Sequence, residues 1–243
     1  MFNKQMSGNP ALKSSAFQFT GARQSEDCMT QAGTYNKTGL LLLICVVTAS
    51  YTMNPSGTAF VLPGAIGGFI LALITIFKKE WSMVTAPLYA LCEGALLGGV
   101  SYMYQVQFPG IVQNAVMLTF GVAFIMLAIF RYKIIEVTQQ LRVGIAAATG
   151  AIFLVYLVSM VMGFFGSSIP MIHSAGPIGI GFSFVVVGIA SFNLLLDFDF
   201  IERASEQGNT PKYMEWFGAF GLMVTLVWLY LELLRLLSKL NRR

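Results

Sequence analysis

Seven long apolar runs, separated by short polar segments, dominate the chain from residue 38 onward. A helix that crosses a bilayer needs about 20 mostly apolar residues, and each run reaches or approaches that length. We therefore predict an all-α membrane protein with seven transmembrane helices. The expected spans cover residues 38–54, 58–77, 83–104, 109–130, 143–165, 177–200 and 216–238.

The composition agrees with a surface that faces lipid. The chain is 56% hydrophobic and 11% charged, whereas a soluble domain carries about 25% charged residues. Lipid tails solvate Leu, Ile, Val and Phe, so a protein in a bilayer does not need a charged coat. We expect the lipid bilayer to be the main partner, and we expect no nucleic-acid binding because no basic face is present.

The first 37 residues are polar and lack the apolar stretch of a signal peptide. We predict a mostly disordered tail over 1–37 and a transmembrane domain over 38–243. This tail and the loops after the second, fourth and sixth expected spans hold eleven of the fifteen Lys and Arg residues. Because cytoplasmic loops carry an excess of Lys and Arg, we predict a cytoplasmic N-terminus.

The end of the chain conflicts with that charge rule. The other four basic residues are Arg235, Lys239, Arg242 and Arg243. Seven spans would place them on the opposite side from the N-terminus. The last apolar run is nevertheless long enough to cross, and we predict that it does.

Glu93 lies near the middle of the third expected span, among small residues. An ionisable group at a helix centre costs about 2.5–3.5 kcal/mol on insertion scales, so it requires an explanation. Glu93 is either a protonatable group or cation ligand, or a protonated side chain that makes one hydrogen bond between helices. The residues around it favour neither interpretation.

Two aspartates end the sixth expected span. Asp197 and Asp199 lie about 200° apart around a helix, so they face different ways. Asn193 lies one turn before Asp197 on the same side, and we predict that both face the interior of the bundle and that Asp197 has a functional role. Asp199 lies four residues before Arg203, which is the spacing of a helical ion pair, and we expect an ion pair near the membrane interface.

The seventh expected span also carries ionisable residues. Glu232 and Arg235 are three residues apart and are expected to form a local ion pair near the interface. Glu215 is expected in an interfacial belt with Tyr213 and Trp216. The chain contains no HExxH, GxSxG, P-loop or dinucleotide motif and one His, so we predict no enzyme and no cofactor.

Three segments resemble the Bax inhibitor family, in its bacterial YccA-like branch. They are SFNLLLDFDFIE (191–202), YMEWFGAFGLMVTLVWLYLELLRLL (213–237) and APLYALCEGALLGG (86–99). The resemblance implies seven helices, the last of them central and wrapped by two triplets. It also implies a bacterial inner membrane protein.

The resemblance further implies a pH-sensitive calcium leak in which an aspartate of the sixth helix pairs with an aspartate of the seventh. Asp197 matches the first aspartate, and the second position falls on Thr225, a departure from the family. Glu232, Asp199 and Glu93 are candidate substitutes for the missing aspartate.

Two functions follow as expectations. The first is a passive, pH-modulated leak for calcium or other cations, with Asp197 as sensor and weak metal ligand and Glu93 along the pathway. Calcium prefers six to eight oxygen ligands, so the few buried carboxylates fit passage better than storage. The alternative is a regulatory protein that binds and modulates a membrane protease through its N-terminal tail.

Overall fold

The computed structural model describes residues 28–166 and 174–242. These residues form seven long helices. All seven are long and apolar enough to cross a membrane, which confirms the predicted fold class. They are α1 (Gln31–Thr52), α2 (Val61–Phe77), α3 (Ser82–Gln107), α4 (Ile111–Arg131), α5 (Gln139–Phe164), α7 (Pro177–Glu206) and α8 (Met214–Asn241), with the short 3-10 helices η4 (Pro55–Phe60) and η5 (Lys79–Trp81) between them.

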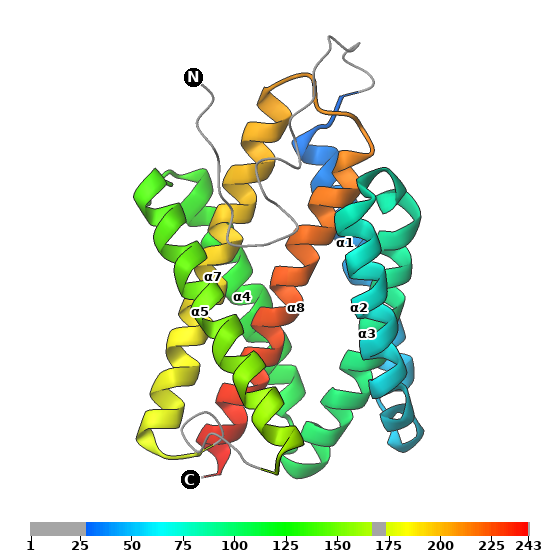
Figure 1. Cartoon of the computed structure of the whole chain (residues 1–243), viewed down its shortest axis with the longest axis vertical. Coiled ribbons are helices and arrows are strands. Elements are labelled where there is room, and N and C mark those ends of the chain that lie inside the picture. Colours follow the sequence, from blue (N-terminus) through cyan, green and yellow to red (C-terminus); the bar gives the residue numbers. More distant parts are fainter. Residues whose placement is uncertain (1–27, 167–173, 243) are drawn as a thin grey trace.

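The helices stand side by side along the long axis of the molecule (Figure 1). We call the end where α1 and α8 begin the upper end, and the end where α8 finishes the lower end. At 28 residues and 1.5 Å per residue, α8 is about 42 Å long, more than the ~30 Å of a hydrocarbon core. The last span therefore has the length that the sequence predicted for a full crossing.

Helix α8 is the centre of the bundle. It packs against α1, α3, α4 and α7, and 83% of its most apolar 18-residue segment is buried, against 11% in α5. The other six helices form two groups: α3 packs against α1 and α2, and α7 packs against α4 and α5. We call these groups the first and the second triplet. This arrangement confirms the expected pair of three-helix layers around a central C-terminal helix.

The first helix begins seven residues before the expected span, so it crosses the predicted boundary at residue 37. The Thr30 side chain caps α1 by accepting from the Gly33 N–H. Thr34 and Thr38 each donate to the carbonyl four residues earlier, which lets polar residues sit inside the helix. Residues 1–27 of the predicted tail lie outside the described residues, so disorder there stays a prediction.

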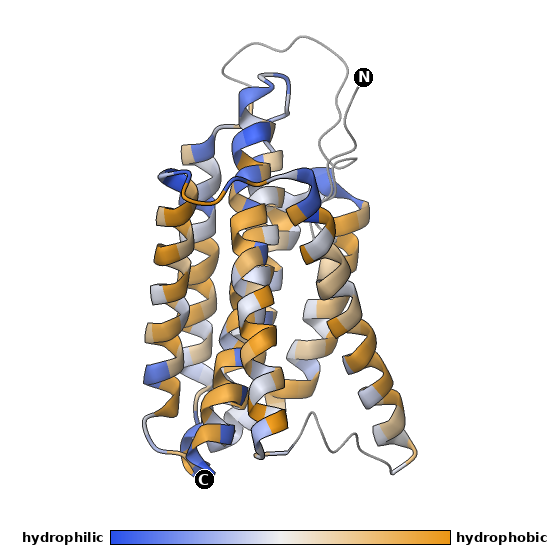
Figure 2. Ribbon diagram, turned by 90° about the vertical axis from the view of Figure 1, so that its left-hand side faces the viewer, coloured by the Kyte–Doolittle hydropathy of each residue, from blue (hydrophilic) through white to orange (hydrophobic). Residues whose placement is uncertain are grey.

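The outer surface of the bundle is apolar between two more polar ends (Figure 2). Large side chains remain uncovered there, such as Phe69 on α2 and Phe153 on α5, each 65% exposed. In water such a surface would promote aggregation, but it is the normal surface of a protein that faces lipid.

Candidate functional site

Polar side chains, most of them buried, lie between α7 and α8 and toward α5, and together they form what we call the polar stripe. Its members are Arg142, Thr149 and Tyr156 on α5, Ser183, Asn193, Asp197 and Asp199 on α7, and Thr225, Glu232, Arg235 and Lys239 on α8. From Asp199 to Ser183 the stripe extends over 16 residues of α7, which is about 24 Å. It therefore covers most of the thickness of a hydrocarbon core.

Asp197 is the most deeply buried acid of the stripe. Its exposed fraction is 0%, and the Thr225 hydroxyl of the central helix donates to its Oδ2 at 2.5 Å. Thr225 itself is 2% exposed. Asp197 is thus shielded from water and has a polar partner on another span, because Thr225 occupies the position facing it.

Asn193 continues the stripe one turn below Asp197. Its side-chain amide donates to the Thr149 hydroxyl of α5 at 2.8 Å and to the Ile189 carbonyl of its own helix at 2.9 Å. Asn193 is 1% exposed. The prediction that Asn193 and Asp197 both face the interior is confirmed, with α5 as the additional neighbour.

Asp199 forms the upper end of the stripe. Its two oxygens pair with two arginines, Oδ1 with Nε of Arg203 and Oδ2 with Nη2 of Arg142, both at 2.9 Å. The ion pair with Arg203 was expected from the spacing. Arg142 adds a buried cation from α5, and it also donates to the Val137 carbonyl at 3.1 Å. Asp199 therefore fastens the start of α5 to the end of α7.

A pocket of about 530 Å³ opens beside this pair. Besides Asp199, three carboxylates line it, those of Glu136, Glu202 and Glu206, together with the cations of Lys133 and Arg203. Acidic walls attract cations, and this pocket borders the upper end of the stripe.

Glu232 and Arg235 form the predicted ion pair, at 2.8 Å, but not as a local pair alone. Glu232 is 2% exposed, and Tyr156 of α5 donates to its Oε1 at 2.9 Å. The same tyrosine oxygen accepts from Nη1 of Arg235 at 2.6 Å. Glu232 lies seven residues from Thr225, about 10 Å along α8, so the structure does not bring it to Asp197.

Glu93 lies in the other triplet. It is partly buried, and a Cβ built on Gly68 of α2 would lie 3.0 Å from its Oε2. Among the described residues, none forms a hydrogen bond or an ion pair with Glu93. Asp197 lies between α7 and α8, so the two acids that were predicted to share one pathway lie on helices of different triplets.

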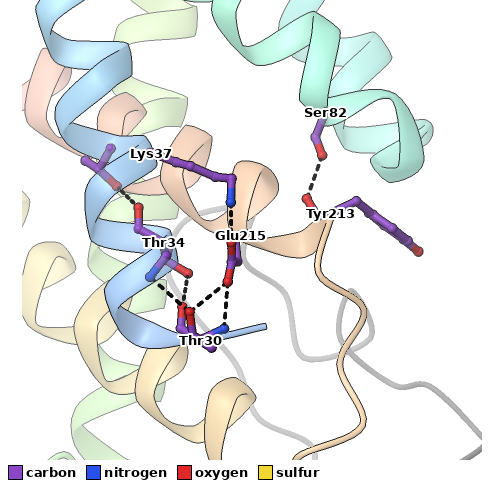
Figure 3. A network of polar contacts seen from close by, with 8 residues as sticks. Thr30, Thr34, Lys37, Ser82, Tyr213 and Glu215 are labelled. Atoms are coloured by element: carbon purple, nitrogen blue, oxygen red, sulfur yellow. Dashed lines mark hydrogen bonds and ion pairs between the residues drawn. The ribbon is translucent and has the colours of Figure 1, made fainter. Parts of the chain in front are cut away.

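Glu215, predicted in an interfacial belt, is buried against α1 at the start of α8. It is 1% exposed and accepts from the Thr30 N–H at 2.9 Å, from the Thr30 hydroxyl at 2.8 Å and from the Lys37 ammonium (Figure 3). The Ser82 hydroxyl of α3 donates to the adjacent Tyr213 carbonyl at 3.1 Å. The upper end of α8 is thus fixed to the first triplet.

Sequence reasoning missed Arg142, Thr149 and Tyr156 as members of the site. Each lies on α5 and contacts a partner at least 44 residues away, which no local spacing reveals. Lys239 was noticed only as part of a basic cluster at the end of the chain.

These features define a polytopic integral membrane protein with ionisable groups buried between its spans. The chain matches the family described as Bax inhibitor 1 like over residues 9–242, and it belongs to that family. The resemblance inferred from the sequence is confirmed at this level, whereas the YccA-like branch stays a prediction. No curated protein and no solved structure matches the chain.

Proposed function

We propose that this protein is a passive, pH-modulated leak for calcium and other cations in a bacterial inner membrane. One observation carries the proposal: the fully buried Asp197 carboxyl group is hydrogen-bonded to the central helix near the upper end of the polar stripe. Ionisable residues inside membrane spans are expensive and typically mark ion or proton pathways. The upper end would face the cytoplasm, since the loops there carry most of the Lys and Arg residues.

Thr225 suits both protonation states of Asp197. Its hydroxyl donates to Asp197 at 2.5 Å, and the Gly221 carbonyl of its own helix is a second acceptor at 3.4 Å. When Asp197 is charged, the hydroxyl stabilises the carboxylate. When Asp197 is protonated, its O–H donates to the Thr225 oxygen, and the hydroxyl turns to Gly221. Proton binding thereby removes a negative charge between α7 and α8 and reverses the hydrogen bond that joins them.

The stripe is better suited to passage than to storage. Asp197 and Thr225 provide few of the six to eight oxygens that calcium prefers. The acidic pocket beside Asp199 would gather cations at the upper end. Asp197 is then the next carboxylate along the stripe, and it would serve as a weak, transient ligand.

The proposal is tested by calcium entry into liposomes that contain the purified protein, measured over a range of pH. Wild-type flux should depend on pH, and the Asp197→Asn variant should lose that dependence because it has no proton to exchange. In Thr225→Asp two carboxylates share the site and cannot both stay ionised, so the pH profile should gain a second step. Glu80→Gln, an exposed acid outside the stripe, is the control.

Two results would contradict the proposal. One is wild-type flux no greater than that of empty liposomes. The other is an Asp197→Asn variant with an unchanged pH profile.

Regulation of a membrane protease is the second candidate function. The described chain starts on the upper surface, where the Cys28 thiol donates to the Gly208 carbonyl at 3.0 Å and the Met29 N–H donates to the Thr210 carbonyl at 2.7 Å. A partner that binds the tail would therefore act on the loop between α7 and α8 through these two hydrogen bonds.

Deletion of residues 1–27 tests this role because it keeps the contacts of Cys28 and Met29. The deletion should abolish modulation of the protease and leave calcium flux intact. Equal protease activity with the full-length and the truncated protein would contradict this second function.

A further inference from the structure

A buried lysine closes the lower end of the polar stripe. Lys239 lies in the last turn of α8 and is 4% exposed. Its ammonium donates to the Gly179 carbonyl at 2.9 Å and to the Ser183 hydroxyl at 2.8 Å. Both acceptors lie in the first two turns of α7, so this side chain ties the end of one stripe helix to the start of the other.

The two halves of the stripe differ in charge. Above Asn193 it contains the acids Asp197 and Asp199 with the cation Arg142, and Arg203 also pairs with Asp199 from a more exposed position. Below Asn193, the described residues of helices α5, α7 and α8 include one acid, Glu232, and two cations, Arg235 and Lys239. Glu232 is already paired with Arg235 at 2.8 Å. The lower half therefore has a net positive charge, and Lys239 lies nearest its end.

From this geometry we infer that Lys239 is the residue that limits cation passage and sets its selectivity at the lower end of the stripe. The inference rests on the proposed leak function. A positive charge in surroundings of low dielectric constant repels an approaching cation, and the repulsion grows with the charge of the ion. For a cation to pass, the Lys239 ammonium must break its hydrogen bonds to the Gly179 carbonyl and the Ser183 hydroxyl.

The experiment compares Lys239→Met, which removes the charge at similar length, with Lys239→Arg, which keeps it. Initial rates of calcium and potassium entry into liposomes are measured at one fixed pH. Lys239→Met should raise calcium entry by about tenfold and potassium entry less, because the divalent ion feels the stronger repulsion. Lys239→Arg should stay close to the wild-type rates, as should Lys78→Met, a matched change at an exposed lysine of the upper end.

Lys239→Gln provides a second uncharged variant that can still bond to Ser183, in case the apolar Met disturbs folding. Wild-type calcium rates in both uncharged variants would overturn the inference. So would an equal rise in Lys239→Arg with no change in the ratio of calcium to potassium, because Lys239 would then act only through packing. In either case the effect of Asp197→Asn would still stand, and the proposed function with it. No flux through wild type and all Lys239 variants would overturn both.

Discussion

The two triplets around α8 are held together by different kinds of contact. In the first triplet, helices approach so closely that only glycine fits. A Cβ built on Gly94 would lie 2.5 Å from the Cys45 carbonyl oxygen of α1, and one on Gly64 would lie 2.8 Å from the Cys92 carbonyl oxygen of α3. In the second triplet, a Cβ on Gly144, Gly150 or Gly188 would meet nothing within 4 Å.

Polar side chains replace close backbone packing in the second triplet. Arg142, Thr149 and Tyr156 reach from α5 to partners on α7 and α8, while α5 itself is mostly uncovered. Backbones in tight van der Waals contact move little without loss of packing, whereas side-chain bonds can break and re-form as charges change. The first triplet is therefore suited to be a scaffold, and the second to be the part that responds to protons and ions.

The largest effect on stability is expected when the α5 anchor is broken. Arg142 is 7% exposed and pairs with Asp199, so Arg142→Gln leaves a buried carboxylate with one partner and should destabilise the fold by about 3 kcal/mol. Arg203 holds the same carboxylate from a side chain that is 41% exposed, and Arg203→Gln should cost less than about 1 kcal/mol. Thermal unfolding in detergent measures both. Equal losses would contradict the role given to Arg142.

Glycine substitutions test the packing difference between the triplets. Gly94→Ala places a methyl group against the backbone of α1 and should destabilise the fold by about 2 kcal/mol. Gly150→Ala, in open space on α5, should be neutral or stabilising by up to about 1 kcal/mol, because alanine is the better helix former. Melting temperatures that fall equally in both variants would remove the distinction between a tight and a loose triplet.

A smaller loss is expected at the link between α5 and α8. Tyr156→Phe removes the hydroxyl that joins Glu232 and Arg235 and should cost about 1 kcal/mol. Tyr51, 82% exposed, serves as control, since Tyr51→Phe should leave the melting temperature unchanged. An unchanged melting temperature in Tyr156→Phe would mean that other contacts hold α5 to α8.

The helices could be predicted from the sequence because lipid imposes a long apolar run on every span. Asp197 and Asn193 could be placed on one face because helical spacing alone decides it. The start of α1 was misplaced because its threonines satisfy their hydroxyls within the helix, so polar residues there do not end it.

The rest of the site depends on contacts between distant helices. Glu215 reads as an interfacial acid in its own segment, yet Thr30 and Lys37 bury it from 178 or more residues away. Glu93 and Asp197 are equally unusual in sequence, and only the arrangement of the triplets assigns them to different places. Such pairings depend on which helices become neighbours, and that information is not local.

Calcium flux as a function of pH in Asp197→Asn and Glu93→Gln, measured side by side in liposomes, tests the central claim most directly. Both changes remove one acid from a membrane span, but only Asp197 lies on the polar stripe. We predict that Asp197→Asn abolishes the pH dependence and that Glu93→Gln retains the wild-type profile. The opposite result, with the pH response lost in Glu93→Gln and kept in Asp197→Asn, would contradict the assignment of the pathway to the second triplet.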